Sequence, residues 1–429
     1  MVFLIREDTV SEAKKVICEQ CDLVLEIPEC QGVKVGVCPR CGSVVHHYHP
    51  SPVIYSLCFA ISALAMIIST DFLPFLTINF SGLSNSMMLL DYVSILFDKD
   101  LGLVSLLIMM FMHFFPIVAL FIIIICDCCY LKHKKSRFIA LLLKFYVFCK
   151  DWSMVDVFVV GVLVSLIKLV NLVDVVYEFG FWSYILFALL FILSVSRFHV
   201  HVMWEYFFPQ SPIERNIVSG VTAYNQGFTN CHVCDEIVDI KKSSVCPRCG
   251  ADVVKIHERS IQKCLAFLIA AVAIYIPANL YPMMITFYMG SGEESTILEG
   301  VIVLWELKSY FVSMVIFIAS VCIPILKILV LFYLCYVYLS FKRAKKKKLL
   351  GILFRVVEFI GKWSMVDVFV VAIMVSIVRM GNIMIIDPGS ALVSFGAVVI
   401  LTILAAKQFN PKLLWINLNR NQNNGERDE

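Results

Sequence analysis

The sequence predicts an all-α polytopic membrane protein, built from two parallel four-helix transmembrane repeats that each follow a small β-type zinc ribbon. Three observations support this fold class. Of the 429 residues, 60% are hydrophobic and only 16% are charged, whereas about a quarter of the residues in soluble domains are charged. The block WSMVDVFVV occurs twice, and two CxxC motifs stand near the start of each half of the chain.

An internal duplication relates the two halves. A CPRCG motif opens at Cys38 and again at Cys246, 208 residues later, and the WSMVDVFVV blocks begin at Trp152 and Trp363, 211 residues apart. Such self-similarity is the signature of repeated structural units. We therefore expect ribbon 1 in residues 1–50, module 1 in 51–208, a linker with ribbon 2 in 209–258, module 2 in 259–416 and a polar cytoplasmic tail in 417–429.

Eight apolar stretches are near or above the roughly 20 residues that cross a bilayer core. They cover approximately residues 52–76, 101–131, 154–176 and 181–201 of module 1, and residues 264–286, 310–340, 365–386 and 391–407 of module 2. Because each module has an even number of spans, both ribbons lie on the same side of the membrane. The N-terminal stretch has acidic residues where a cleavable signal would be basic and apolar, so we expect no cleavage there.

Loop charges assign the two sides. The basic loops KHKKSR at 132–137 and KRAKKKK at 342–348 face the cytoplasm, because lysine and arginine accumulate in cytoplasmic loops. The loops on the other side are acidic, with Asp98 and Asp100 in module 1 and Glu293 and Glu294 in module 2. Both termini and both ribbons are therefore expected in the cytoplasm, and the modules form parallel repeats.

The cysteines of the ribbons have the spacing of metal ligands. Ribbon 1 contains Cys18, Cys21, Cys38 and Cys41, and ribbon 2 contains Cys231, Cys234, Cys246 and Cys249. Two knuckles that turn four thiolates toward one point suit a tetrahedral Zn²⁺, one per ribbon. Domains this small need their metal to fold. The alternative is a redox dithiol, which the cytoplasmic placement and the repeated CPRCG disfavour.

Polar residues inside the predicted spans are candidates for a functional site, because burying an ionisable group in a bilayer is costly. Lys327 lies in the interior of the sixth span, where module 1 has Ala119, and Asp367 of the second block is a candidate ion-pair partner. The other members of this predicted site for lipid or proton handling are Ser320, Ser364, Thr402, Arg379, Lys168, Asp156 and His113. Arg379 and Lys168 are expected on the same helices as the aspartates, twelve residues further along.

Some of these residues also have a purely structural interpretation. The tryptophan of each block follows a basic residue, so we expect the block to begin at the cytoplasmic interface, where indole prefers to lie. Ser153 and Ser364 would then cap the next helix. Asp156 and Asp367 would fall in its first turn, where the helix dipole favours an anion. By itself, His113 is more typical of a hydrogen-bonded interior histidine than of a proton carrier.

The order of these motifs resembles that of the paraquat-inducible protein A family. The resemblance rests on the duplicated CxxC, CPRCG and WSMVDVFVV motifs and on ANLYP and FNPKLLW in the second copy, and it extends from about Cys18 to Trp415. It implies modules similar to tetraspanin-like and TARP-like proteins, in the inner membrane of a diderm bacterium. It also implies phospholipid transport with a periplasmic MCE-domain tunnel protein. Module 1 departs from the pattern with DFLP and FHVHVMW, which leaves open whether it binds anything itself.

These features predict a transport component rather than an enzyme. The sequence has no GxxxxGK[ST] nucleotide-binding motif, and a net charge of +3 gives no support for a nucleic-acid partner. We expect the chain to load or extract phospholipid at the inner membrane and so maintain the outer membrane. A membrane scaffold that only anchors the MCE protein is the alternative, and a CxxC redox membrane protein is a third.

Overall fold

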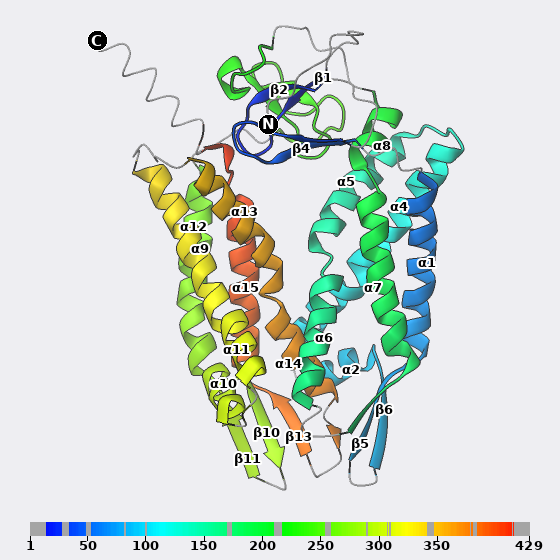
Figure 1. Cartoon of the computed structure of the whole chain (residues 1–429), viewed down its shortest axis with the longest axis vertical. Coiled ribbons are helices and arrows are strands. Elements are labelled where there is room, and N and C mark those ends of the chain that lie inside the picture. Colours follow the sequence, from blue (N-terminus) through cyan, green and yellow to red (C-terminus); the bar gives the residue numbers. More distant parts are fainter. Residues whose placement is uncertain are drawn as a thin grey trace.

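The two ribbons lie at one end of the molecule, the β-sheets of the modules lie at the other, and the long helices run between them (Figure 1). This arrangement comes from a computed structural model that describes residues 14–27, 34–48, 53–80, 83–98, 101–169, 174–209, 217–253, 259–288, 291–306, 308, 310–340, 347–377, 379–380, 384–413 and 415. The fold is mostly helical, as predicted, but it also contains strands outside the ribbons, which the sequence analysis did not predict.

The long helices repeat in the same order in both modules, whereas the two ribbons differ in their described strands and the helix Val200–Phe207 of module 1 has no counterpart among the described helices of module 2. Ribbon 1 has β1 (Lys14–Ile17), β2 (Val24–Ile27), β3 (Lys34–Val37) and β4 (Val44–Tyr48), and ribbon 2 has η2 (Tyr224–Gln226), β8 (Phe228–Asn230) and β9 (Ile237–Asp239). The helices of module 1 are α1 (Val53–Phe72), α2 (Asp91–Asp98), α3 (Gly102–Met109), η1 (Met110–Phe114), α4 (Phe115–Leu131), α5 (Arg137–Trp152), α6 (Val155–Leu169), α7 (Phe179–Arg197) and α8 (Val200–Phe207). Those of module 2 are α9 (Arg259–Leu280), α10 (Ile297–Glu306), α11 (Tyr310–Phe317), η3 (Ile318–Cys322), α12 (Ile323–Leu339), α13 (Lys347–Trp363), α14 (Val366–Ile377) and α15 (Ala391–Gln408).

Within the described residues, six helical segments are long and apolar enough to cross a membrane. They are Val53–Phe72, Gly102–Leu131 and Phe179–Arg197 in module 1, and Ser260–Leu280, Ile318–Leu339 and Ala391–Gln408 in module 2. These segments correspond to the first, second and fourth predicted spans of each module. A seventh and an eighth span stay a prediction.

The third predicted span of each module differs from expectation. Helices α6 and α14 end at Leu169 and Ile377, and the chain continues into β7 (Asp174–Tyr177), and into β12 (Arg379–Met380) and β13 (Met384–Pro388). Arg379 therefore lies in a strand and not on the helix of Asp367. The misprediction has a physical reason. Hydropathy alone does not tell whether an apolar run rich in β-branched residues forms a helix or a strand.

A sheet closes the far end of each module. In module 1 the strand order is β6 (Leu83–Met88), β5 (Pro74–Phe80), β7, and in module 2 it is β11 (Ser291–Ser295), β10 (Met284–Tyr288), β13, β12, with antiparallel neighbours. The strands begin at the proline motifs DFLP and ANLYP. In each module a glycine lets the chain pack closely against the proline of this motif. A Cβ on Gly180 would lie 2.6 Å from the carbonyl oxygen of Pro74, and a Cβ on Gly389 would overlap the carbonyl oxygen of Pro282.

The repeated WSMVDVFVV block forms the contact between the two modules. Helices α6 and α14 pack together, and Phe158 meets Phe369, its counterpart 211 residues later, with ring centroids 5.5 Å apart in an edge-to-face arrangement. Because the same residue of each copy meets its equivalent, the contact lies on an approximate two-fold axis. The Ser165 hydroxyl donates to the carbonyl oxygen of Val370 at 3.3 Å.

The block lies further from the basic loop than predicted. Helix α5 has 16 residues, or about 24 Å of rise, and separates that loop from Trp152, which stacks on Phe111 of η1 at 5.6 Å. Lys407 of module 2 binds Asp151 at 3.2 Å and lies 4.8 Å from the Trp152 ring. The block therefore belongs to the contact between modules. The predicted serine cap is also wrong, because the buried Ser153 hydroxyl has no hydrogen-bond partner among the described atoms.

A bulky residue at Gly161 should separate the modules. A Cβ at this position would already lie 3.0 Å from the Cβ of Phe369, so Gly161→Leu forces α6 away from α14. Overpacking of this kind costs about 1–3 kcal/mol, and we expect the unfolding temperature of the purified chain to fall by several degrees. The matched control is Gly300→Leu in α10, where nothing lies within 4 Å. Equal unfolding temperatures for the two variants would contradict the assigned contact.

Candidate metal centres and buried polar site

Each ribbon gathers four cysteine sulfurs that could hold a metal ion. Within each set of four, Cys18, Cys21, Cys38 and Cys41 or Cys231, Cys234, Cys246 and Cys249, all sulfurs lie within 4.8 Å of one another, and all eight cysteines are buried. The shortest sulfur pairs are 3.5–3.6 Å apart. A tetrahedral site with metal–sulfur bonds of about 2.3 Å has sulfurs about 3.8 Å apart. The spacing therefore fits a four-thiolate site, and none of these cysteines forms a disulfide.

The backbone of all four knuckles follows one pattern. The residue after the second cysteine has a positive φ: 59° at Asp22, 74° at Gly42, 53° at Asp235 and 66° at Gly250. Its amide donates to the carbonyl oxygen of the first cysteine at 2.8–3.0 Å. Glycine and, less readily, aspartate tolerate this conformation, and the turn directs both thiols of a knuckle to the same side.

Crowding of the thiols lowers the pKa of two cysteines in each ribbon, Cys18 and Cys41 in ribbon 1 and Cys231 and Cys246 in ribbon 2. Contacts with neighbouring thiols, chiefly that of Cys21, lower the pKa of Cys18 to about 6. In ribbon 2 the contact with Cys234 has the same effect and lowers the pKa of Cys231 to about 7. Since the thiolate is the form that binds metal, both centres are suited to a cation.

The ribbons dock crosswise, each on the module of the other half. Ribbon 1 packs on module 2, where the Arg40 guanidinium lies 4.7 Å from the centre of the Trp415 ring. Arg355 of α13 donates to the carbonyl oxygens of Cys41 at 3.2 Å and Gly42 at 3.5 Å. The cysteines of ribbon 1 share one buried cluster with apolar residues of α9, α12 and α13. The first metal centre therefore rests on the second set of helices.

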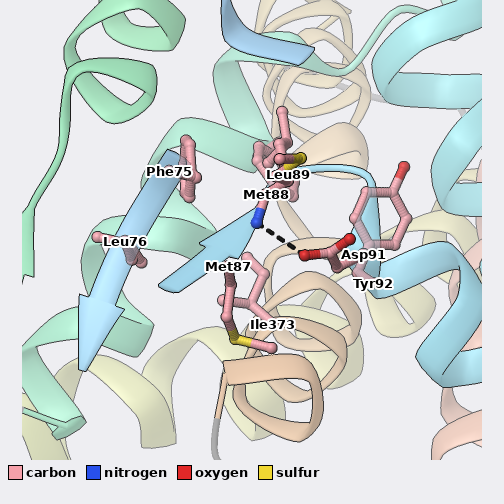
Figure 2. A pocket seen from close by; sticks show the side chains of 9 residues that line it. Phe75, Leu76, Met87, Met88, Leu89, Asp91, Tyr92 and Ile373 are labelled. Carbon is pink, nitrogen blue, oxygen red and sulfur yellow. Dashed lines mark hydrogen bonds between the residues drawn. The ribbon is translucent and has the colours of Figure 1, made fainter. Parts of the chain in front are cut away.

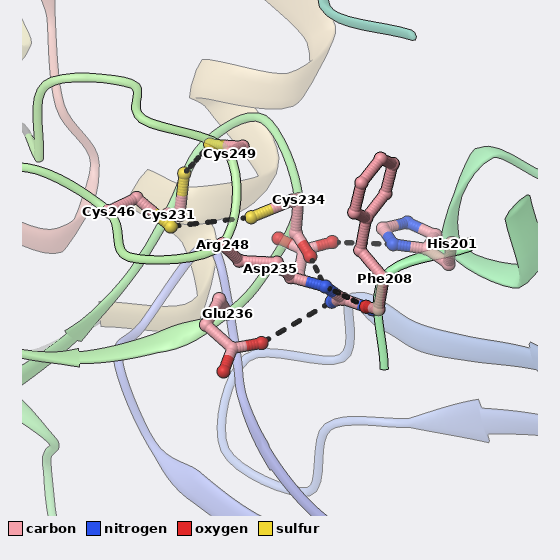
Figure 3. A network of polar contacts seen from close by, with 9 residues as sticks. All are labelled: His201, Phe208, Cys231, Cys234, Asp235, Glu236, Cys246, Arg248 and Cys249. Atoms are coloured by element: carbon pink, nitrogen blue, oxygen red, sulfur yellow. Dashed lines mark hydrogen bonds and ion pairs between the residues drawn. The ribbon is translucent and has the colours of Figure 1, made fainter. Parts of the chain in front are cut away.

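Ribbon 2 docks on module 1 in the equivalent way (Figure 3). Arg248, the counterpart of Arg40, donates through Nε to the carbonyl oxygen of Phe208 at 2.6 Å and lies 6.0 Å from the Trp204 ring. It also pairs with Glu236 at 3.4 Å. His201 of α8 lies 2.8 Å from Asp235 in the knuckle turn. Each candidate metal centre thus contacts the module of the other half through an arginine of its own CPRCG motif.

A single lysine joins the two ribbons to module 2. Lys412, buried beyond the end of α15, lies 3.3 Å from Asp22 of ribbon 1 and also binds Asn230 of ribbon 2. The second carboxylate oxygen of Asp22 accepts a hydrogen bond from the amide of Tyr224 at 2.7 Å. The two ribbons therefore form one head over the helices.

The predicted polar site of module 2 is centred on Lys327. This side chain is 1% exposed, and its amine donates to the hydroxyl of Thr402 on α15 at 2.9 Å. The Thr402 hydroxyl in turn donates to the carbonyl oxygen of Val399 at 2.9 Å. Gly361 of α13 leaves room beside the amine, since a Cβ there would lie 3.4 Å from Nζ. Three helices therefore meet at one buried amine.

The other predicted members lie at different places. Ser320 is buried in η3, seven residues before Lys327, and the buried Ser364 hydroxyl has no partner among the described atoms. Asp156 is exposed in the first turn of α6. The backbones of Asp367, Lys168 and Arg379 belong to α14, α6 and β12, but their side chains lie outside the described part of the chain, and with them the predicted Lys327–Asp367 ion pair.

Module 1 contains buried polar pairs of its own. His113 lies in η1, and its Nε2 is 3.0 Å from the carboxylate of Asp71 at the end of α1. On α4, Asp127 is fully buried beside Ser56 of α1. Sequence reasoning missed Asp71, Asp127 and Ser56. The only signal in the sequence was Asp127, an acid inside the apolar run that precedes the first basic loop.

A small cavity lies where the modules meet near the sheets (Figure 2). Met87, Tyr92 and Phe158 of module 1 and Ile373 of α14 are among the residues that line it, and Asp91 at its edge accepts a hydrogen bond from the amide of Met88 at 2.8 Å. Its volume of about 30 Å³ is too small for an acyl chain.

The fold and the two centres define a class of protein: a multi-pass membrane protein with an internal duplication and a four-cysteine ribbon before each copy. The profile of the family described as Paraquat-inducible protein A matches residues 55–207 and 261–419, one segment per module. The chain belongs to this family, which confirms the predicted resemblance.

Several curated relatives match over nearly their whole length. Intermembrane transport protein PqiA of Escherichia coli K12 is 32% identical over 94% of this chain and 96% of its own. Lipophilic envelope-spanning tunnel protein A of the same organism is 28% identical over 93% and 90%. A probable intermembrane transport protein of Haemophilus influenzae is 29% identical over 93% and 95%. No solved structure matches the chain.

Removing one ligand should empty one centre only. We expect the purified chain to bind two metal ions and Cys38→Ser to bind one, because a four-thiolate site loses most of its affinity with the loss of a ligand. The measurement is metal content per chain by mass spectrometry. Cys58→Ser, at an exposed cysteine of α1, is the control and should leave the metal content unchanged. A metal content that is the same in both variants would contradict the assignment.

Proposed function

We propose that this chain is the inner-membrane component of an intermembrane phospholipid transport system. It would load or extract phospholipid at the inner membrane, work with a periplasmic MCE-domain tunnel protein and maintain the outer membrane. The names of the full-length relatives support transport between membranes. The observation that carries the proposal is Lys327, a buried amine in an apolar helix with only a hydroxyl partner among the described side chains.

A phospholipid headgroup would supply what Lys327 lacks. A buried ammonium is costly unless it is paired, and a phosphate oxygen accepts strong charge-assisted hydrogen bonds from it. The Thr402 hydroxyl donates its proton to the carbonyl oxygen of Val399, so the hydroxyl oxygen accepts a hydrogen bond from the amine of Lys327. One or two protons of that amine then remain available to a ligand. We infer that Ser320, Ser364 and Asp367 complete this site, with Arg379 nearer its outer end and Asp156, Lys168 and His113 as the corresponding groups of module 1.

The remaining assignments concern topology and metal. We infer eight crossings, in which α5 with α6 and α13 with α14 supply the third of each module. The ribbons then face the cytoplasm and the sheets face the periplasm, where the edge strands β6 and β11 offer unpaired backbone groups to the MCE partner. Each ribbon would hold one Zn²⁺, which is the usual occupant of four-cysteine sites.

Replacing the buried amine tests the lipid site. Lys327→Met keeps the length of the side chain and removes the charge. We expect the amount of anionic phospholipid that co-purifies to fall at least about tenfold, because a hydrogen bond to a charged group contributes about 1.5–3 kcal/mol. Lipid mass spectrometry of the purified chain measures this. Lys263→Met, at an exposed lysine of α9, is the matched control and should retain lipid.

The same variant separates transport from scaffolding. In cells that depend on this chain for resistance to detergent, Lys327→Met should abolish resistance while its membrane level and its co-purification with the MCE partner stay normal. A scaffold that only anchors the partner needs no buried amine. Full resistance in Lys327→Met cells would therefore favour the scaffold and reject transport through this site.

A further inference from the structure

Module 1 buries a carboxyl group that the lipid site does not use. Asp127 lies in α4, near the end of the apolar segment Gly102–Leu131, and its side chain is fully buried. One carboxyl oxygen lies 2.6 Å from the hydroxyl of Ser56 on α1, and the other has no hydrogen-bond partner among the described atoms. No lysine, arginine or histidine pairs with it within the part of the chain that the structure describes.

The hydrogen count at Ser56 is compatible with a protonated Asp127. The Ser56 oxygen lies 2.8 Å from the carbonyl oxygen of Val53 and 2.6 Å from Asp127. A hydroxyl has one proton to donate, and a carbonyl oxygen can only accept. If Ser56 donates to Val53, the proton in the shorter contact comes from the carboxyl group. The geometry thus fits a neutral acid that donates to Ser56, which donates to the end of α1.

Among the described residues, no cation faces Asp127, and the Ser56 hydroxyl is the one group that would favour its carboxylate. Within the described part of the chain, the titratable groups that interact with Asp127 are Cys126 on α4 and Tyr146 on α5, both neutral at physiological pH and both buried. Helix α7 contributes the hydroxyl of Ser194, which donates to the backbone oxygen of Ser56 at 3.3 Å. An isolated carboxylate in such a place takes up a proton rather than bear the cost of desolvation.

Module 2 shows that the fold does not need an acid at this position. The counterparts of Ser56 and Asp127, 208 residues later, are Cys264 and Cys335. Their sulfurs are 3.7 Å apart, and both side chains are fully buried. Two weakly polar thiols therefore fill the same space between the first and second long helices. The acid of module 1 is an addition to the packing rather than a requirement of it.

We propose that Asp127 and Ser56 form a proton-binding site in module 1. The site holds its proton while α1 packs against α4, and releases it when the two helices separate and water or a cation reaches the carboxyl group. Proton binding is thereby coupled to the closure of module 1. This inference goes beyond lipid binding at Lys327 and does not depend on it.

Infrared spectroscopy of the purified full chain in lipid nanodiscs detects the proton directly. At pH 7 we expect the C=O absorption of a protonated carboxyl group in a difference spectrum between the native chain and Asp127→Asn. Asp98→Asn, at an exposed acid of α2, is the control and should give no such band at this pH. A native chain with only carboxylate absorption at Asp127, or with an equal band for both variants, would overturn the proposal.

A second variant tests the coupling even if Asp127→Asn folds poorly. The double substitution Ser56→Cys with Asp127→Cys copies the pair of module 2 and should fold. Because the packed native chain holds a proton that the unfolded chain releases, its unfolding temperature should fall as the pH rises from 5 to 8. The double variant should lose this part of the pH dependence. The same pH dependence in both proteins would reject the coupling.

Discussion

The contact between α6 and α14 determines how the rest of the molecule is arranged. It brings together the same residues of two copies, with Phe158 against Phe369, and so places the modules around an approximate two-fold axis. Each module keeps its own bundle of long helices away from that axis, and its sheet lies at the end distant from the ribbons (Figure 1). The conspicuous repetition of WSMVDVFVV follows from this geometry, because a symmetric contact needs the same surface twice.

The two modules share a framework but bury different polar groups in it. Module 2 has Lys327 with Thr402, whereas module 1 has Ala119 and Phe191 at these positions. Module 1 has Asp127 with Ser56, whereas module 2 has a pair of thiols. One copy therefore carries a buried amine and the other a buried acid. Since the duplication, one copy has come to bury a base and the other an acid, at different places and without a change of fold. We therefore expect the two modules to have different functions.

Much of the architecture could be predicted from sequence, and the failures have identifiable causes. Knuckle spacing predicted both four-cysteine clusters because CxxC geometry is local. Lys327 stood out because a charge within an apolar run is conspicuous. The strands at 174–177 and 384–388 were not predicted, because hydropathy does not distinguish a helix from a strand. The pairing of Asp127 with Ser56 joins residues 71 apart, and a serine in an apolar helix gives no signal of its partner.

The crosswise docking of the ribbons indicates how the duplicated chain arose and why neither half is complete by itself. Arg40 contacts Trp415, and Arg248 contacts Trp204, so each half completes the other. This is the pattern of a domain-swapped homodimer whose two subunits have been fused into one polypeptide. A half-length fragment would expose both an uncovered ribbon and an uncovered helical surface. Two such fragments expressed together should therefore associate. Either fragment alone would have no module for its ribbon to dock on and no ribbon to cover its own module.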